Sequence, residues 1–557
     1  MKISKVKIAF VLMLVLGGVM GGCKKSSSTP EPPPPPVFRV NSVQVEGKHD
    51  GKRWRIDGRV PKATFTFSAP VDRSTVNAGV TLKNASGTNL AFTPSYQDGD
   101  KVLVIQASSQ QPGLSEYTIS VTTALKSMDN AALQNAESVK VMTAIDSSDK
   151  FPLVSDDELL TLVQQQTFKY FWDFAHPVSG LARERNTSGE TVTTGGSGFG
   201  IMALIVGIER GFITRAQGLE RMEKIVGFLK NNAQKFHGAF PHWLNGTTGA
   251  VQPFSQKDDG ADLVETSFLM AGLLTARQYF DGADAAEANL RNDINSLWNA
   301  VEWDWFRKND ENVLYWHWSP NYEWEMNHQV RGWNECLITY VLAASSTTHT
   351  IPKIVYDNGW AKNGGIVNGN TYAGHTLPLG EPYGGPLFFS HYSFLGINPH
   401  DLADAYANYW EQNRAHTLIH YNYCRNNTNW YGYSDMNWGL TASDDINGYK
   451  AHSPTNDNGV ISPTAALSSF PYTPTESMKA LKFFYYKLGD KLWGNYGFYD
   501  AFSLHEPWFA NSTLAIDQGP IIIMIENYRT GLIWNLFMSC PEVKAGLTKL
   551  GFTSPNL

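Results

Sequence analysis

The spacing of the apolar residues changes once along this 557-residue chain, near residue 150. Before that point apolar and polar residues alternate, as at 63–67, 102–106 and 117–121, and a period of two predicts strands. After it, apolar residues recur at the spacing of a helix face up to the C-terminus. The chain therefore predicts a mainly α fold preceded by a small all-β domain.

The all-β region covers residues 37–145. About seven short strands fit into it, separated by turn signals such as Asn-Ala-Ser-Gly at 84–87 and Asp-Gly-Asp at 98–100. This pattern predicts an immunoglobulin-like β-sandwich. Because the region shows neither a pair of acids nor the spacing of metal ligands, we expect it to serve as a spacer or docking module.

The mainly α region covers residues 150–557. Ser155 and Glu158 form a capping box that predicts the start of its first helix. Segments such as 337–344 and 521–525 are apolar all round, which predicts helices buried on every side. Together with amphipathic helices and long Gly- and Asn-rich loops, they predict an (α/α)6 toroid. We expect its further helices near 198–210, 214–231, 262–280, 283–298, 333–345, 400–423, 474–488, 520–538 and 541–550.

The first 23 residues have the pattern of a lipoprotein signal peptide. Three lysines precede an apolar run at 8–20, which is too short to span a bilayer, and Met-Gly-Gly-Cys follows. This resembles a bacterial lipobox with Cys23 as the lipidated residue, although a secretory signal with a chance Cys is the alternative. Residues 24–36 form a Ser/Pro-rich linker. Two lysines directly after Cys23 favour a periplasm-facing anchor, on the outer or inner membrane, over the cell surface.

Composition excludes several classes of function. A net charge of −7 and a pI near 6.1 argue against a nucleic-acid partner. Cys336, Cys424 and Cys540 are widely spaced, so they indicate neither a disulfide framework nor a zinc site. We expect no metal, no cofactor and a monomer. The 17 tryptophans are an excess that indicates either a wide core or surfaces on which ligands stack.

Three acids stand at helical spacing: Asp258, Asp262 and Glu265 occupy positions i, i+4 and i+7. At ~100° per residue they fall within an arc of ~60° on one helix face. Like charges so close raise at least one pKa, as in sites that hold an acid and a base together. A solvated acidic helix start is the alternative, but the residues that follow are apolar.

A fourth acid, Glu335, ends a stretch that holds seven tryptophans and enters an apolar helix beside Trp333. Desolvation there would raise the pKa of Glu335 and make it a proton donor at neutral pH. An ion pair with Arg331 is the alternative. The tryptophans are Trp298, Trp303, Trp305, Trp316, Trp318, Trp324 and Trp333.

Other positions complete the predicted site. Asp517, ahead of Pro520 at a helix start, is either a cap or a general base. Asp444 lies in a loop with Trp438 and either holds sugar hydroxyls or forms a plain turn. Arg183, with its neighbours Glu184 and Arg185, is a candidate for the cleft rim. The predicted substrate contacts are Trp333, Trp438, Arg331, Asp444, Arg183 and Trp318.

The sequence supports neither a nucleotide-binding loop nor a serine-nucleophile motif. The four glycines within 195–200 resemble a nucleotide loop, but no strand precedes them and no Lys-Ser/Thr follows. A GxSxG nucleophile motif is missing from the sequence.

Five motifs together resemble glycoside hydrolase family 144, the glucoamylase-like bacterial lipoproteins that degrade β-1,2-glucan, over about 150–557. The resemblance implies an (α/α)6 toroid, an inverting mechanism without metal, and a cleavage site lined by the four acids discussed above. Family members differ between endo-cleavage and exo-release of sophorose, and an added β domain would favour exo action. The motifs are KDDGADLVET at 257–266, GWNE at 332–335, WGLTA at 438–442, DQGP at 517–520 and IENYRTG at 525–531.

The sequence therefore predicts a hydrolase of β-1,2-linked glucan or its oligosaccharides, with Glu335 as proton donor. For the general base, the group of Asp258, Asp262 and Glu265 ranks ahead of Asp517. A non-catalytic glycan-binding lipoprotein of a polysaccharide-uptake system is one alternative. A polysaccharide lyase on a similar toroid is another, but it needs a Tyr or His base and a basic cleft, which the acidic cluster disfavours.

Overall fold

The computed structural model describes residues 37–47 and 53–557 and divides the chain into two compact units, with the boundary between Ala144 and Ile145. The predicted signal peptide, Cys23 and the linker at 24–36 lie outside the described residues. Within the described part, none of the helices is both long and apolar enough to cross a membrane.

The first unit consists of two four-stranded sheets, in the orders β1-β3-β6-β5 and β2-β8-β7-β4. Alternate side chains of each strand point inward, as Ala63, Phe65 and Phe67 do in β3, and they pack into a separate core. The predicted immunoglobulin-like sandwich is confirmed, with one strand more than expected. The strands are β1 (Val40–Gln44), β2 (Arg53–Arg55), β3 (Lys62–Phe67), β4 (Val80–Asn84), β5 (Phe92–Gln97), β6 (Val102–Ala107), β7 (Glu116–Val121) and β8 (Glu137–Met142), with the short helical turns η1 (Arg73–Thr75) and α1 (Val76–Gly79) between β3 and β4.

The second unit is mainly helical, and the capping box at Ser155 and Glu158 opens its first helix as predicted. Its helices are α2 (Asp156–Trp172), α3 (Thr194–Glu209), α4 (Arg215–Asn231), α5 (Leu263–Tyr279), α6 (Ala285–Asn299), α7 (Leu337–Ser345), α8 (Lys353–Asn358), α9 (Tyr409–Asn426), α10 (Pro463–Leu467), α11 (Pro474–Lys482), α12 (Gly489–Leu492), α13 (Ala515–Arg529), α14 (Leu532–Met538) and α15 (Pro541–Leu550). Short strands in its loops include β9 (Thr191–Thr193), β10 (Trp243–Asn245), β11 (Val251–Gln252), β12 (Ala261–Asp262), β13 (His317–Trp318), β16 (Ala442–Asp445), β17 (Gly448–Ala451), β19 (Gly497–Phe498) and β20 (Phe502–Ser503).

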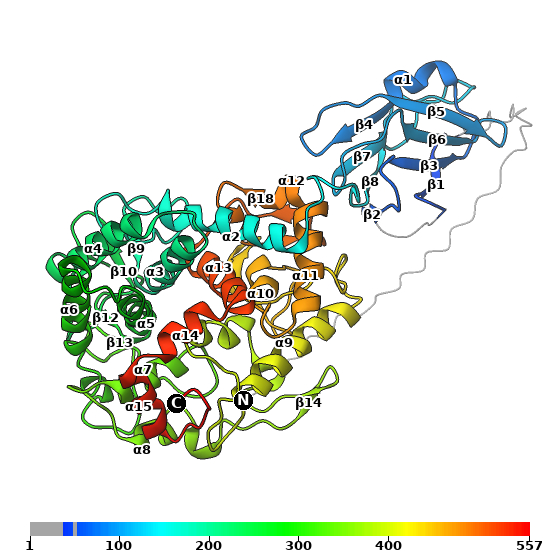
Figure 1. Cartoon of the computed structure of the whole chain (residues 1–557). Coiled ribbons are helices and arrows are strands. Elements are labelled where there is room, and N and C mark those ends of the chain that lie inside the picture. The colour runs from blue at the N-terminus through cyan, green and yellow to red at the C-terminus, as the bar shows by residue number, and fades with distance from the viewer. Residues whose placement is uncertain (1–36, 48–52) are drawn as a thin grey trace, which may run out of the picture. The chain divides into compact units, whose positions relative to one another are not determined.

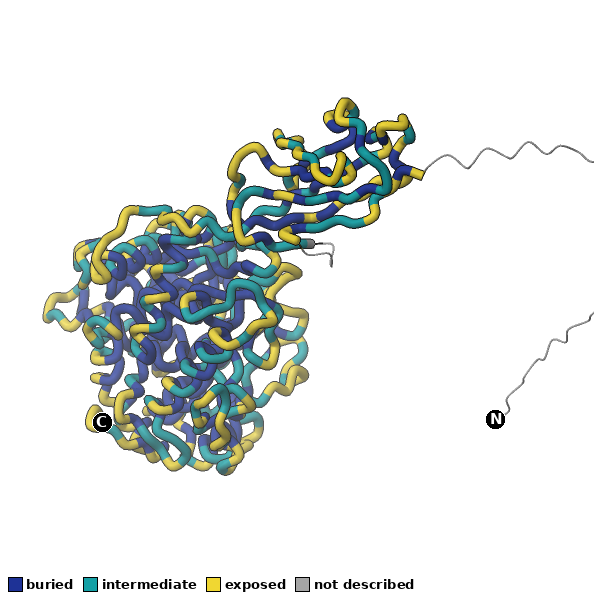
Figure 2. The backbone as a smooth tube through the Cα atoms, turned by 90° about the vertical axis from the view of Figure 1, so that its right-hand side faces the viewer, coloured by how far each residue is buried: buried dark blue, intermediate teal, exposed yellow. Residues whose placement is uncertain are grey.

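The helices form a closed toroid whose inner ring runs through α3, α5, α7, two short 3-10 turns, α10 and α13 (Figure 1). The turns are η5 (Leu387–Ser390) and η6 (Ser393–Leu395), which contact each other, α7 and α13. Helix α13 also packs on α3 and α2, so the last inner helix closes the ring onto the first. Figure 2 shows the buried backbone concentrated inside this unit.

Two predicted helices differ most from the structure. The helix expected at 400–423 begins only at Tyr409, and the fourth inner position holds the turns η5 and η6 because Pro386 and Pro399 bracket this segment. The helix expected at 520–538 is divided at Gly531, whose φ of 72° lies in the left-handed region.

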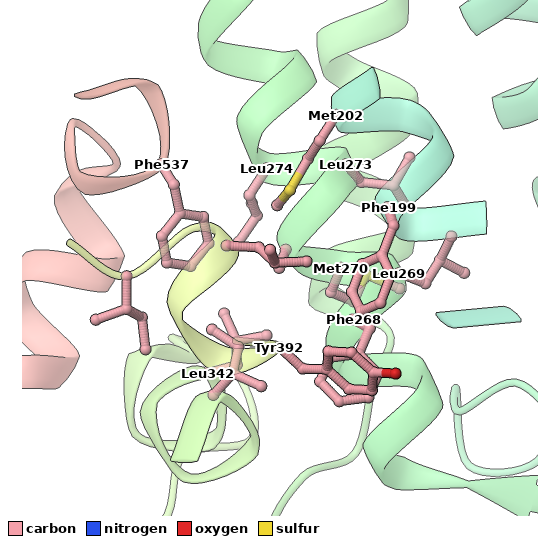
Figure 3. Close-up of a cluster of buried hydrophobic side chains, with 14 of the residues drawn as sticks. Phe199, Met202, Phe268, Leu269, Met270, Leu273, Leu274, Leu342, Tyr392 and Phe537 are labelled. Atoms are coloured by element: carbon pink, nitrogen blue, oxygen red, sulfur yellow. The ribbon is translucent and has the colours of Figure 1, made fainter. Parts of the chain in front are cut away.

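The glycine run at 195–200 is a helix-packing feature within α3. A Cβ on Gly198 would lie 2.2 Å from the carbonyl oxygen of Phe268 in α5, and a Cβ on Gly272 would lie 2.3 Å from the carbonyl oxygen of Gly198. The two inner helices therefore approach backbone to backbone. Around them, Phe199, Phe268 and Tyr392 join the buried cluster of Figure 3.

Candidate active site

A cavity of about 530 Å³ opens at one end of the inner ring. Its size is that of sites for small organic ligands. Its carboxyl groups are Glu184, Glu265 and Glu335, and its aromatic lining is Trp243, Phe254, Phe268, Trp316, Phe388, Tyr392 and Tyr449. The cavity therefore combines acids with flat apolar rings.

Glu335 belongs to the loop that leads into α7, which begins at Leu337 rather than at 333. The Ser393 hydroxyl of η6 donates a hydrogen bond to the backbone carbonyl of Glu335, and the Cys336 N–H donates to Asn334 Oδ1. These bonds fix the loop while the carboxyl group lines the cavity. Burial raises the pKa of Glu335 to about 7, and the negative charge of Glu265 adds to the effect. Glu335 therefore holds its proton to a higher pH than an ordinary glutamate does.

Glu265 lies in the first turn of α5 and reaches the same cavity. Its Oε2 accepts a hydrogen bond from the Gly195 N–H at 2.7 Å, and a Cβ on Gly195 would lie 2.5 Å from that oxygen. Glycine at 195 thus allows the backbone of α3 to hold this carboxyl. Burial raises the pKa of Glu265, although the His242 cation opposes the shift.

His242 carries the positive charge beside the acids Glu265 and Asp262. Its Nδ1 donates to Asp262 Oδ2 at 2.9 Å, while Asp262 Oδ1 caps α5 by accepting from the N–H groups of Val264 and Glu265. Burial opposes protonation of His242, but the charges of Glu265 and Asp262 outweigh it and raise its pKa to about 9. Asp262 is fully buried, so it positions the helix and the imidazole without reaching the cavity.

Asp258 precedes α5, so the three predicted acids do not share one helix face. A tight turn brings it back: the Asp258 N–H bonds to the carbonyl of Ser255. His317 Nε2 then lies 3.4 Å from Asp258 and 3.6 Å from Asp262. Burial and the charge of Asp262 raise the pKa of Asp258 to about 7. Asp258 stands behind the cavity rather than in its lining.

Among the described residues, one group has the donor types of a metal site: His242, Asp258 and Asp262 place ligand atoms within 4.8 Å of one another. In this group His242 is already bonded to Asp262, and Asp262 caps a helix. The arrangement is thus explained by charge pairing within the chain.

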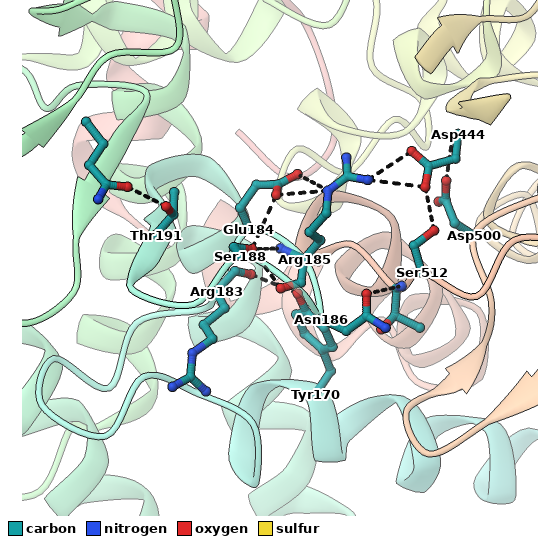
Figure 4. A network of polar contacts seen from close by, with 12 residues as sticks. Tyr170, Arg183, Glu184, Arg185, Asn186, Ser188, Thr191, Asp444, Asp500 and Ser512 are labelled. Carbon is teal, nitrogen blue, oxygen red and sulfur yellow. Dashed lines mark hydrogen bonds and ion pairs between the residues drawn. The ribbon is translucent and has the colours of Figure 1, made fainter. Parts of the chain in front are cut away.

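Another part of the cavity lining belongs to a polar network centred on Arg185 (Figure 4). Arg185 Nε contacts both oxygens of Glu184 at 3.1 and 3.0 Å, and its Nη1 contacts both oxygens of Asp444 at 3.1 and 3.2 Å. The Asp444 N–H donates to Asp500 Oδ2 at 2.6 Å, and the Ser512 hydroxyl donates to Asp444 Oδ2. Asp444 therefore anchors the hairpin β16–β17, which carries Tyr449 into the cavity.

Asp517 lies in the first turn of α13 and is 2% exposed. Pro520 sits inside this helix, not at its start. Asp517 stays behind the cavity wall, whereas its neighbours Leu514 and Ile516 line it. Burial raises the pKa of Asp517 well above its ordinary value, and the nearby Asp500 carboxyl raises it further.

Several predicted substrate contacts lie away from the cavity. Trp333 and Trp438 are buried core residues, and the Trp438 indole donates to the carbonyl of Glu476. Trp318 packs against Trp305 and Phe236.

Two predicted arginines also point elsewhere. Arg331 is exposed and bonds Gln329 and the carbonyl of Asn358, so it does not pair with Glu335. Arg183 donates to the carbonyls of Gly189 and Phe174 and faces away from the network of Figure 4.

Sequence reasoning missed the exposed aromatics. Phe254 is 51% exposed and its ring lies 4.3 Å from the His242 ring, tilted by 33°, and Tyr449 is 52% exposed. The sequence signal that could have identified them is a large aromatic residue in a loop or at the tip of a hairpin. Asp500, between Tyr499 and Ala501 in an apolar stretch, offered none.

A larger and shallower hollow, about 940 Å³, lies elsewhere on this unit and has a different character. Its cations are taken by ion pairs: Arg529 with Asp157, and Lys482 with Asp156, both at 2.6 Å. Its acids, Asp156 and Asp157, are exposed, whereas Glu265 in the other cavity is buried, which leaves the cavity at Glu335 as the candidate active site.

Both units of the chain are similar to known proteins. Residues 327–541 match the family described as "putative glucoamylase", and residues 57–143 match the bacterial Ig-like domain family. The exo β-1,2-glucooligosaccharide sophorohydrolase of Parabacteroides distasonis is 48% identical over 428 residues, 72% of this chain, and the match spans 59% of that relative's length.

Two solved structures match the toroid throughout their length. A structure from Bacteroides uniformis, described in the same words as the family, is 60% identical, with 73% of this chain and 100% of that chain covered and a TM-score of 0.72. An endo-β-1,2-glucanase from Chitinophaga pinensis, complexed with sophorotriose and glucose, is 57% identical, with 73% and 100% covered and a TM-score of 0.71.

Proposed function

This chain belongs to the glucoamylase-like glycoside hydrolases of family 144, and from this membership and the cavity we propose that it hydrolyses β-1,2-linked glucan or its oligosaccharides. The proposed reaction inverts the anomeric carbon. The observation that carries the proposal is Glu335, a cavity-lining acid whose pKa is raised to about 7, so that it can still hold a proton near neutral pH.

In the proposed reaction, Glu335 donates its proton to the glycosidic oxygen as the bond to the anomeric carbon breaks. Water attacks from the opposite face and loses its proton to a carboxyl across the cavity. Such pairs of carboxyl groups stand roughly 6.5–9.5 Å apart in inverting enzymes. Glu265, next to Glu335, keeps the donor protonated by its charge and offers an acceptor to a sugar hydroxyl.

Exposed rings supply the sugar contacts in this proposal. The Phe254 ring contacts the His242 ring at 4.3 Å and the edge of the Trp243 ring at 4.9 Å, and about half of the residue remains exposed. Tyr449 stands on the β16–β17 hairpin, part of the other wall. Two aromatic faces on separate walls suit consecutive glucosyl units.

The hydrolysis of linear β-1,2-glucan by the purified protein tests the proposal. Sizing of the products separates exo from endo action, because sophorose alone indicates release from a chain end and a ladder indicates internal cleavage. Proton NMR of the first product identifies inversion by its α-anomer. Binding without cleavage would instead indicate a glycan-binding lipoprotein, and unsaturated products would indicate a lyase.

We further propose that the protein is a monomer tethered by a lipid on Cys23 and faces the periplasm. The basic start, the short apolar run and the Cys after Gly21 and Gly22 support this. Mass spectrometry of the mature N-terminus tests it: an acylated Cys23 is expected, and an unmodified terminus elsewhere would contradict it.

A further inference from the structure

The hollow of about 940 Å³ lies at the end of the toroid remote from the candidate active site. Helix α3 begins beside the cavity, where the Gly195 N–H binds Glu265, and its C-cap, Arg210, lines the hollow. Helix α13 likewise begins at the cavity, with Ile516, and ends at the hollow, with Arg529. At ~1.5 Å per residue, α13 separates the two sites by roughly 20 Å. A ligand in the hollow therefore does not contact the cavity.

The charged groups of this hollow are neutralised by partners within the chain. Its four cations are Arg210, Lys479, Lys482 and Arg529, and each has a carboxylate partner within 3.2 Å. Arg210 binds both oxygens of Glu526, at 2.6 and 2.8 Å, which fixes the plane of its guanidinium. The hollow thus offers donors and acceptors at fixed positions without a free ionic charge. It suits a neutral polar ligand better than a phosphate or an acidic peptide.

Tyr528 supplies an exposed ring to the hollow. The residue is 44% exposed, and its ring lies 5.5 Å from the ring of Phe470, which is fully buried. Among the described residues, the exposed tyrosines are Tyr528 and Tyr449, and Tyr449 lines the cavity at the other end. A half-exposed ring beside polar groups suits a sugar, because the apolar face of a pyranose stacks on the ring while its hydroxyls form hydrogen bonds.

A second hollow, of about 400 Å³, extends this surface, since Lys479 and Lys482 line both hollows. It adds the exposed side chain of Met436 and the ring of Tyr486. Tyr486 belongs to the π-helical turn η7 (Phe483–Lys487), a rare geometry that is frequent at functional sites. Two adjoining hollows form an elongated surface, which suits a chain of sugar units better than a single small molecule.

We propose that this elongated surface is a second, non-catalytic binding site for a neutral glucan chain. The inference rests on the proposed function, which makes linear β-1,2-glucan the polymer concerned. Tyr528 stacks on one glucosyl ring, and the paired Arg529 and Asp157 bond hydroxyl groups beside it. Because the acids of this hollow are exposed, the chain is held there without being cleaved. A chain held at one end of the toroid is present at a higher effective concentration at the other.

Kinetics on long and short substrates test this site. Tyr528→Ala should raise KM for linear β-1,2-glucan at least ~5-fold with little change in kcat. On short β-1,2-gluco-oligosaccharides its KM should equal that of the wild type, because a short chain fills the cavity without reaching the hollow. Ile354→Ala is the matched control: Ile354 is 46% exposed on α8 and lines neither hollow, so its variant should match the wild type on both substrates.

Binding without cleavage is measured in the Glu335→Gln variant by electrophoresis through gels that contain linear β-1,2-glucan. Adding Tyr528→Ala should weaken the retardation of the protein by the polymer, and adding Ile354→Ala should not.

An unchanged KM of Tyr528→Ala for the polymer, or an equal rise for long and short substrates, would overturn the inference. A dimer that depends on Tyr528 in size-exclusion chromatography would assign the surface to a second copy of the chain and overturn it as well. If the wild type cleaves neither substrate, the proposed function fails separately. The gels then decide the surface alone: retardation that depends on Tyr528 supports it, and retardation that does not, or none, contradicts it.

Discussion

Replacing Glu335 with glutamine should abolish activity and, at alkaline pH, stabilise the protein. The pKa of Glu335 is raised from 4.5 to about 7 in the folded state. The folded state therefore holds this proton more tightly than the unfolded state. Stability from this group is complete at low pH and is lost as the pH rises from 4.5 through 7. Glutamine carries no ionisable group and avoids that loss.

The magnitude follows from the shift. Relative to the glutamine variant, ionisation of Glu335 lowers the free energy of unfolding of the wild type by about 1 kcal/mol at pH 5 and about 3 kcal/mol at pH 8. Both values are upper limits because water in the cavity solvates part of the carboxylate. The toroid spans 145–557. At about 2.1 cal/mol/K per residue its unfolding entropy is roughly 0.9 kcal/mol/K, so the variant should melt up to about 3 °C higher at pH 8 and about 1 °C higher at pH 5.

Differential scanning calorimetry of both proteins at the two pH values measures this difference. Reducing-sugar release from linear β-1,2-glucan measures activity, which should fall at least ~10²-fold. An equal shift in melting temperature at both pH values would refute the raised pKa. Near-normal turnover would remove Glu335 as the donor.

Three further substitutions separate core from cavity. Trp438→Phe should leave turnover unchanged and lower the free energy of unfolding by roughly 1–3 kcal/mol, measured in urea, because this ring is buried; a raised KM would restore it as a sugar contact. Phe254→Ala should leave stability within about 0.5 kcal/mol and raise KM for oligosaccharides, since half of its surface is exposed; an unchanged KM would exclude stacking. Arg185→Gln leaves the carboxylates of Glu184 and Asp444 without their cation and should lower the free energy of unfolding by roughly 3–5 kcal/mol. Arg185→Lys should recover only part of this free energy. A glutamine variant as stable as the wild type would contradict the network.

Local patterns predicted most of the fold. Alternation located β3, β6 and β7 to within a residue, and the capping box located the start of α2. The fourth inner position was not predictable in this way. Its turns have no helical period, and they are buried only because neighbouring helices enclose them.

The site was predictable in its acids and not in its rings. Glu265 and Glu335 line the cavity. Their position could be predicted because an acid at the start of an apolar, buried helix is costly for folding and therefore indicates a functional role. Nearness in sequence did not show which way Trp333 and Trp438 point; both fill the core, where a large ring gains most from burial. Asp500 is brought to Asp444, from whose N–H it accepts a hydrogen bond, by tertiary packing alone.

The closure of α13 onto α2 and α3 also means that the cavity is complete only when the whole toroid has folded. One cavity wall begins at Glu184 and another ends at Ile516, about 330 residues later. Until α13 docks, α3 lacks its last neighbour and exposes an apolar surface. A chain interrupted before α13 therefore yields an aggregation-prone fragment rather than a weaker enzyme.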